Sequence, residues 1–149
     1  MDGSKDSDRG PGTPSRSSPA EEPHPLERTV VLPAGAEAPA SARDFANGLD
    51  LGLGREAADH FELMVSEVVT NSVLHAGLET GDPIEMSVRS LPDRVRVEVG
   101  DGGRGFESEE GPRGRGTIGG WGLVIVDRLA SRWGTAEGER FGVWFEIDR

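Results

Sequence analysis

A glycine-rich segment between a strand pattern and a helix pattern constrains the fold of this 149-residue chain more than any other feature. Residues 100–120 contain nine glycines and almost no apolar side chains. A stretch of this length is unusual as a simple connection inside a compact domain, and such loops often serve a binding site. Glycines also let a backbone approach a ligand without side-chain collisions. We therefore expect residues 100–120 to form a mobile lid over a bound ligand.

Two helices and a short strand are expected before this segment. A strand at residues 29–32 leads into a helix over 38–49, and Gly52 and Gly54 interrupt the chain before a longer helix over 55–75. Apolar spacing of three and four residues marks the buried face of the longer helix. The residues on this face are Phe61, Met64, Val65, Val68, Val69 and Ser72.

The strands around the glycine-rich segment alternate apolar and polar side chains. Residues 84–90 and 94–99 predict a hairpin with one wet face. A helix over 123–130, a short strand near 132–136 and a last strand over 141–147 are expected to follow. This order indicates an α/β fold, an α+β two-layer sandwich with one mixed sheet. The helices should cover one face, because a sheet covered on both faces would show continuous apolar runs.

Composition divides the chain and excludes several classes of function. Residues 1–27 are rich in Ser, Pro, Gly and charge and are expected to be a disordered tail before a single domain over 28–149. A net charge of −11 disfavours nucleic acid and anionic membranes as partners. The chain has no cysteine and no apolar run long enough to span a membrane. We expect a soluble, cytoplasmic protein without redox chemistry.

Polar residues along one edge of the longer helix are candidates for chemistry. Glu67, Asn71 and His75 are four residues apart and share this edge. A carboxylate here would accept a proton from an attacking hydroxyl, and an amide oxygen one turn later would ligate Mg²⁺. An ordinary solvated helix edge is the alternative. His75 is expected to cap or hydrogen-bond near the helix end rather than bind a metal.

The motif that begins at Asp101 suggests a pocket for a flat base. Asp101 continues the alternation of the strand over 94–99 and is expected to point into the layer between sheet and helices. A ligand with an exocyclic amine, such as adenine, would satisfy this carboxylate, while Gly103 and Gly105 would keep the pocket wall thin. A plain Asp-Gly turn is the alternative.

The Gly-Trp-Gly-Leu sequence at residues 120–123 opens the third helix and suggests a phosphate site. Free N–H groups and the positive end of the helix dipole favour a polyphosphate there, although a glycine-rich linker ended by a helix cap is the alternative. The sequence lacks a GxxxxGK[ST] motif, and its single lysine, Lys5, lies in the tail. Backbone N–H groups, Mg²⁺ and arginines must then meet the phosphate charge. Arg113 and Arg115 are candidates, with solvated loop arginines as the alternative.

Together, three motifs resemble the N, G1 and G2 boxes of the GHKL ATPase and kinase superfamily. They are SEVVTNSVLHAG at residues 66–77, DGGRGF at 101–106 and GGWGL at 119–123. The similarity covers about residues 29–149, and within the superfamily the chain looks like the small serine-protein kinases that act as anti-sigma factors. The resemblance implies a Bergerat-type fold with a Gly-rich ATP lid, which binds ATP with Mg²⁺.

The resemblance also implies roles for individual residues. Glu67 would be the general base and Asn71 the Mg²⁺ ligand. The other expected site residues would bind the nucleotide: Asp101 the adenine amine, Gly103 and Gly105 the base, and Gly120, Gly122 and Leu123 the phosphates. The implied reaction is transfer of the γ-phosphate to Ser or Thr of a STAS-type anti-sigma factor antagonist. A sigma factor is the second implied partner, and the chain is expected to form a homodimer.

One segment departs from the family pattern. Residues 139–142 read Glu-Arg-Phe-Gly, where relatives often have a threonine before Val-Trp-Phe, so one expected hydrogen bond near the adenine is missing. The alternative function is therefore a non-catalytic, nucleotide-responsive module that sequesters a sigma factor or another regulator, because a fold persists more easily than its chemistry. The presence of Glu67 favours the kinase, since a pure binding module does not need that carboxylate.

Overall fold

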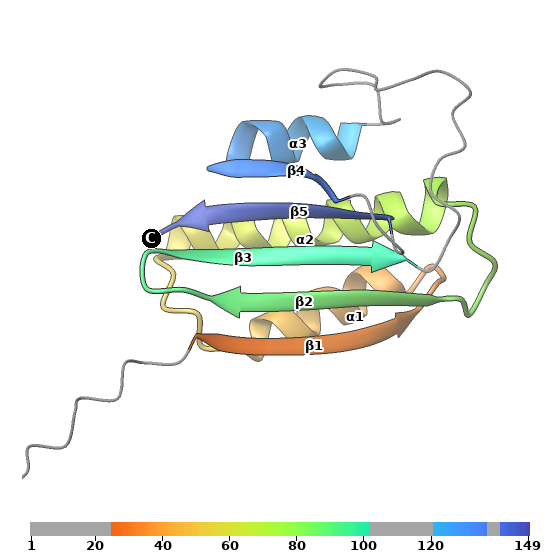
Figure 1. Cartoon of the computed structure of the whole chain (residues 1–149), viewed down its shortest axis with the longest axis horizontal. Coiled ribbons are helices and arrows are strands. Elements are labelled where there is room, and N and C mark those ends of the chain that lie inside the picture. The colour runs from red at the N-terminus through yellow and green to blue at the C-terminus, as the bar shows by residue number, and fades with distance from the viewer. Residues whose placement is uncertain (1–24, 102–120, 137–140) are drawn as a thin grey trace, which may run out of the picture.

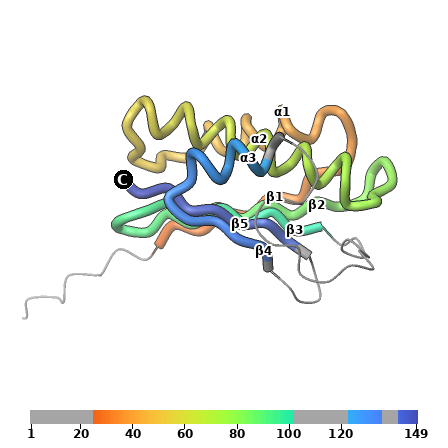
Figure 2. Tube along the Cα trace, turned by 90° about the horizontal axis from the view of Figure 1, so that it is seen from above, coloured from red at the N-terminus to blue at the C-terminus, as the bar shows by residue number. Residues whose placement is uncertain are grey.

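A computed structural model of the chain describes residues 25–101, 121–136 and 141–149. The elements in chain order are β1 (Leu26–Pro33), α1 (Ala38–Asn47), α2 (Arg55–His75), β2 (Pro83–Ser90), β3 (Arg94–Asp101), α3 (Trp121–Leu129), β4 (Arg132–Ala136) and β5 (Phe141–Asp148). They form one sheet and one layer of helices (Figure 1). Seen from above, α1, α2 and α3 all lie on the same side of the sheet (Figure 2). The expected two-layer α/β sandwich is confirmed.

The strand directions differ from the expected mixed sheet. The strands lie in the order β1-β2-β3-β5-β4, and each neighbouring pair in this described sheet is antiparallel. The antiparallel pairing of β1 and β2 follows from the number of times the chain reverses direction between them. Two helices, rather than one, connect β1 to β2, so the chain returns in the opposite direction. β3 and β4 do run in the same direction, but β5 lies between them.

Most element boundaries agree with the sequence patterns. α2 has the expected bounds, whereas α1 ends at Asn47 because Gly48 forms its C-terminal cap. β1 begins at Leu26, so the last residues of the expected tail belong to the sheet. Residues 1–24 of that tail lie outside the described residues. None of the described helices combines the length and apolar character that a membrane crossing requires.

The core lies between the sheet and the helices. The alternate residues of β2, β3 and β5 that face the helices are buried, as the alternation predicted: Ile84, Met86, Val88, Val95, Val97, Val99, Val143, Phe145 and Ile147. The rings of Phe61 in α2 and Phe145 in β5 meet edge to face, with centroids 6.0 Å apart. α1 packs through Ala38, Ala42 and Ala46, whose small side chains are all buried. Burial of these apolar surfaces is the main term that stabilises the two layers.

The last residue joins the two layers at one end of the sheet. The guanidinium of Arg149 donates hydrogen bonds to the carbonyl of Leu51, between α1 and α2, and to the carbonyl of Leu91 in the β2–β3 turn. It also bonds the hydroxyl of Ser90. Gly52 has a φ of 61°, and a Cβ there would collide with the Arg149 side chain. The glycine at position 52 therefore leaves room for the Arg149 side chain beside the loop between α1 and α2.

Candidate functional site

Three segments that carry the sequence motifs meet at one end of the molecule. Figure 1 shows the C-terminal end of α2, the end of β3 and the start of α3 at this end. α2 packs against both α3 and β3. The first turn of a helix leaves N–H groups without intrahelical partners and carries the positive end of the dipole. The start of α3 at Trp121 therefore supplies an anion-binding end beside α2.

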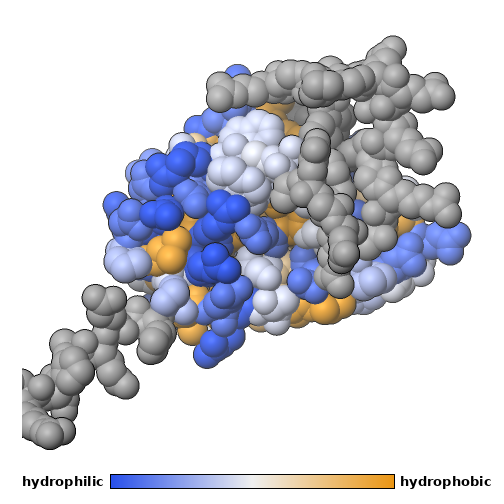
Figure 3. Space-filling model, in the orientation of Figure 1, coloured by the Kyte–Doolittle hydropathy of each residue, from blue (hydrophilic) through white to orange (hydrophobic). Residues whose placement is uncertain are grey.

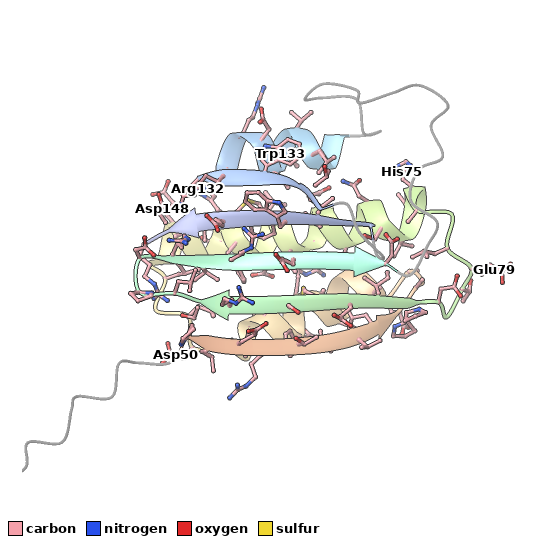
Figure 4. The ribbon with its side chains drawn as sticks, viewed as in Figure 1. Asp50, His75, Glu79, Arg132, Trp133 and Asp148 are labelled. Carbon is pink, nitrogen blue, oxygen red and sulfur yellow. The ribbon has the colours of Figure 1, made fainter. Side chains whose placement is uncertain are left out.

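α2 places two of the candidate polar side chains near this end. Glu67 and Asn71 are half-buried, one turn apart on the same edge of the helix. The Nδ2 atom of Asn71 is buried and forms no hydrogen bond with the described part of the chain. A buried amide normally has a partner, so this atom indicates a place where a ligand or another polar group belongs. His75 is exposed at the end of α2 (Figure 4).

β3 and α3 place two more of the expected residues. Asp101 is the last residue of β3 and is 3% exposed, in phase with the buried valines of that strand. The prediction that it points into the layer between sheet and helices is confirmed. Gly122 lies in the first turn of α3. The side chain of Leu123 is buried in the core, so contact of this residue with a phosphate would come from its backbone N–H.

The other expected site residues lie outside the described residues. These are Gly103, Gly105 and Gly120, the two lid arginines Arg113 and Arg115, and the divergent pair Glu139 and Arg140. The structure thus places the C-terminal part of α2, which carries Glu67 and Asn71, the end of β3 at Asp101 and the start of α3 at one end of the molecule. The contribution of the lid stays a prediction.

The donor set is suited to Mg²⁺ that arrives with a polyphosphate. Within the described ranges, no group of three or more His, Asp or Glu side chains could hold a metal ion. Mg²⁺ is commonly bound through one or two protein oxygens, several waters and the phosphates of its substrate. The buried side-chain amide of Asn71, with no partner in the described chain, fits that role, because its oxygen would face the metal and its nitrogen a phosphate oxygen.

A hollow of about 170 Å³ lies on the opposite face of the sheet, away from these residues. Its floor is the cross-strand pair Gly100 and Gly142, which leave space because neither has a side chain. Glu85, Glu98 and Trp144 line its walls. A polyphosphate would meet carboxylates here, so this hollow is not the nucleotide site.

The sequence patterns did not predict a charged cluster on the same open face. Glu146 of β5 is 6% exposed and lies between three arginines, with Oε2 2.7 Å from Arg132 Nε and Oε1 3.1 Å from Arg96 Nη1. Arg94 Nε lies 3.4 Å from Oε2. Burial raises the pKa of Glu146, but hydrogen bonds from Arg132 and Arg96 and the charge of Arg94 outweigh burial and lower it. The signal that could have revealed this cluster is the alternation of side chains in β3 and β5, which puts Arg94, Arg96 and Glu146 on the same face of the sheet.

The two fully described tryptophans make different contacts. Trp133 lies between β4 and α3, where its Nε1 donates a hydrogen bond to Asp127 at 2.9 Å (Figure 4). Trp144 lies on the open face, with the guanidinium of Arg96 4.1 Å from its ring centroid. A Cβ on Gly134 would lie 2.9 Å from this indole, so the ring needs a glycine beneath it.

Comparison with known proteins agrees with this arrangement. The sequence profile of the histidine kinase-like ATPase domain matches residues 32–142. The chain is 34% identical over 116 residues to the serine-protein kinase RsbW of Listeria innocua, an alignment that covers 68% of this chain and 73% of the relative. RsbW of Listeria monocytogenes shows the same identity and coverage. The chain therefore belongs to the histidine kinase-like ATPases and is similar within them to the GHKL kinases of the anti-sigma factor type.

Proposed function

We propose that this chain is an ATP-dependent serine/threonine protein kinase that phosphorylates a STAS-type anti-sigma factor antagonist and also binds a sigma factor. The observation that carries this proposal is the buried amide of Asn71, one turn after Glu67, at the end of the molecule where α3 begins. The similarity to two serine-protein kinases supports the reaction class. We further propose, from the same resemblance, that the protein acts in the cytoplasm as a homodimer.

Each residue in the proposed mechanism has a separate task. Asp101 would accept a hydrogen bond from the adenine amine, and the N–H groups at the start of α3 would bind the phosphates. Asn71 would hold Mg²⁺ through its side-chain oxygen, and the ion would neutralise charge on the phosphate oxygens. Glu67 would take the proton from the serine hydroxyl of the antagonist. The serine oxygen then bonds to the γ-phosphorus, the bond from that phosphorus to the bridging oxygen breaks, and ADP leaves.

The proposed base is tested by a matched pair of variants. Glu67→Gln should lower the rate of phosphate transfer by about 10² to 10⁴ and leave ATP affinity close to wild type. Glu62→Gln removes a half-buried carboxylate from the opposite edge of α2, 3.8 Å from Arg43, and should transfer phosphate normally. The assay uses labelled ATP, Mg²⁺ and a panel of purified STAS-type antagonists from the same genome. Equal rates for Glu67→Gln and wild type would contradict the assignment.

Asn71 is tested through the metal dependence of nucleotide binding. Asn71→Ala should weaken ATP binding in the presence of Mg²⁺ about tenfold or more, because it removes a contact to a charged group. Binding measured with EDTA should change much less. An unchanged affinity with Mg²⁺ would remove the proposed metal ligand.

The altered segment at residues 139–142 favours the second candidate, a nucleotide-responsive module without phosphoryl transfer. In that case the wild-type chain would bind ATP and a sigma factor but phosphorylate no member of the antagonist panel. Phosphoserine or phosphothreonine on any panel member would reject this candidate.

A further inference from the structure

Two exposed leucines on α2 stand out among the apolar side chains. Large hydrophobic residues with high exposure in the described part of the chain are Val31, Leu63, Leu74 and Val124. Leu63 is 42% exposed and Leu74 is 67% exposed, and both belong to the helix that carries Glu67. Single exposed apolar side chains are common on proteins, so their position must decide whether they have a role.

Both leucines lie beside the proposed base. Residues three, four or seven apart share one side of a helix, which defines an outer stripe of α2. Its members are Glu56, Asp59, Leu63, Glu67, Thr70 and Leu74. Glu67 follows Leu63 by one turn and precedes Leu74 by two turns. A polypeptide that lies along this stripe with its hydroxyl at Glu67 would therefore pass over one of these leucines.

The charges on the outer stripe all have the same sign. It carries three carboxylates, Glu56, Asp59 and Glu67, and no lysine or arginine. None of these carboxylates forms an ion pair with another residue of the described chain. Glu62, which lies off the stripe, is instead paired with Arg43. The stripe thus offers apolar contacts and negative charge, to which an apolar side chain next to a lysine or arginine is complementary.

We propose that the outer stripe of α2 docks the phosphoacceptor protein, which places an apolar side chain against Leu63 or Leu74 and a basic residue opposite Asp59. This inference rests on the proposed function, because it takes Glu67 as the base that the acceptor hydroxyl must reach. It adds the surface that selects the acceptor and the chemistry that the acceptor must present near its serine.

The experiment compares surface variants of the full-length chain in steady-state phosphorylation of the antagonist that wild type phosphorylates best. Leu63→Ser and Leu74→Ser should each raise the KM for the antagonist about five- to tenfold, with kcat and the KM for ATP within about twofold of wild type. Asp59→Lys should raise the same KM and reduce its dependence on salt. Val31→Ser is the matched control, because Val31 is 59% exposed on the other face of the molecule, and its kinetics should not change.

The outcomes separate this inference from the proposed function. Normal transfer by wild type, with an unchanged KM for the antagonist in both leucine variants, overturns the docking surface alone. A wild-type chain that phosphorylates no antagonist overturns the proposed function and the docking surface with it. Leucine variants that weaken sigma-factor binding while their KM for the antagonist stays normal assign the stripe to the sigma factor and also overturn the inference. Circular dichroism confirms that each variant is folded.

Discussion

The two faces of the sheet are built from the same strands but are stabilised by different interactions. The face toward the helices is lined by buried valines, isoleucines, methionines and Phe145. The opposite face carries ion pairs around Glu146, the stacked pair of Arg96 and Trp144, and the hollow over Gly100 and Gly142. Figure 3 shows hydrophilic side chains gathered over part of this open face. One strand can therefore bury an apolar core and present charge, because successive side chains point in opposite directions.

The candidate nucleotide residues and most of the ion pairs also lie on different faces of the sheet. The candidate nucleotide site uses the end of the helix-covered side, where Asp101 is buried and Asn71 has a buried amide. The open face holds most of the ion pairs in the described chain but none of the candidate nucleotide residues. Substitutions on the open face should therefore change folding stability modestly and leave nucleotide binding intact.

Among the four substitutions proposed to compare the two faces, Phe145→Ala should lower the free energy of unfolding the most. Phe145 is fully buried against Phe61, so the substitution leaves a cavity in the core. We expect the free energy of unfolding to fall by about 3–5 kcal/mol. Urea denaturation measures this loss, with Trp144→Leu at the preceding position of the same strand as the comparison. A loss no larger than that of Trp144→Leu would mean that the two faces contribute equally.

Glu146→Gln should have an intermediate effect, because it leaves three partly exposed arginines around a neutral amide. We expect a loss of about 1–3 kcal/mol at neutral pH. The pKa of Glu146 is lower in the folded chain than in the unfolded chain, so its stabilisation is present at higher pH and is lost as the pH falls through the folded-state pKa. Urea denaturation at several acidic pH values should give a shallower pH dependence for the variant. An identical dependence would refute this role.

Arg149→Ala tests the junction between the two layers. The variant loses the hydrogen bonds from the Arg149 guanidinium to the carbonyls of Leu51 and Leu91 and to Ser90. Because Arg149 is exposed and water can replace part of these hydrogen bonds, we expect the free energy of unfolding to fall by about 1 kcal/mol. Amide hydrogen exchange should also quicken in the loop between α1 and α2, while exchange in β3 stays slow. Unchanged exchange in that loop would show that Arg149 does not hold it.

Trp144→Leu should lower the free energy of unfolding the least of the four substitutions. It removes the ring on which Arg96 stacks, and exposed cation–π pairs contribute about 0.5–1 kcal/mol. ATP affinity should not change, because Trp144 lies on the face opposite the candidate site. A clear loss of ATP affinity would mean that the two faces are coupled.

Much of the fold was predictable from local patterns. The period of apolar residues and the glycines before Arg55 predicted both ends of α2, because a helix needs only local spacing and breakers to be recognised. Alternation in β2 and β3 predicted their buried faces and the inward position of Asp101. The order of the motifs also predicted Glu67 and Asn71 as candidates for the site.

Strand direction and long-range neighbours were not predictable in this way. β3 pairs with β5 between residues that lie 40 to 54 positions apart, so no local pattern shows that β5 separates β3 from β4. Glu146 of β5 is surrounded by arginines from β3 and β4, and Arg149 reaches a loop 98 residues earlier in the chain. These contacts depend on which strands become neighbours, and that depends on the packing of the whole sheet against its helices.

By itself, the sequence determined the helix and strand segments, the buried face of each, and the residue types available for a nucleotide site. Those properties follow from periodicity and from the conformational limits of single residues. Only the tertiary structure decided that all neighbouring strands are antiparallel, that α2 and β3 end where α3 begins, and that Leu63 and Leu74 are exposed on the stripe that carries Glu67. Such relations join residues far apart in the chain, and the packing of one layer against the other sets them.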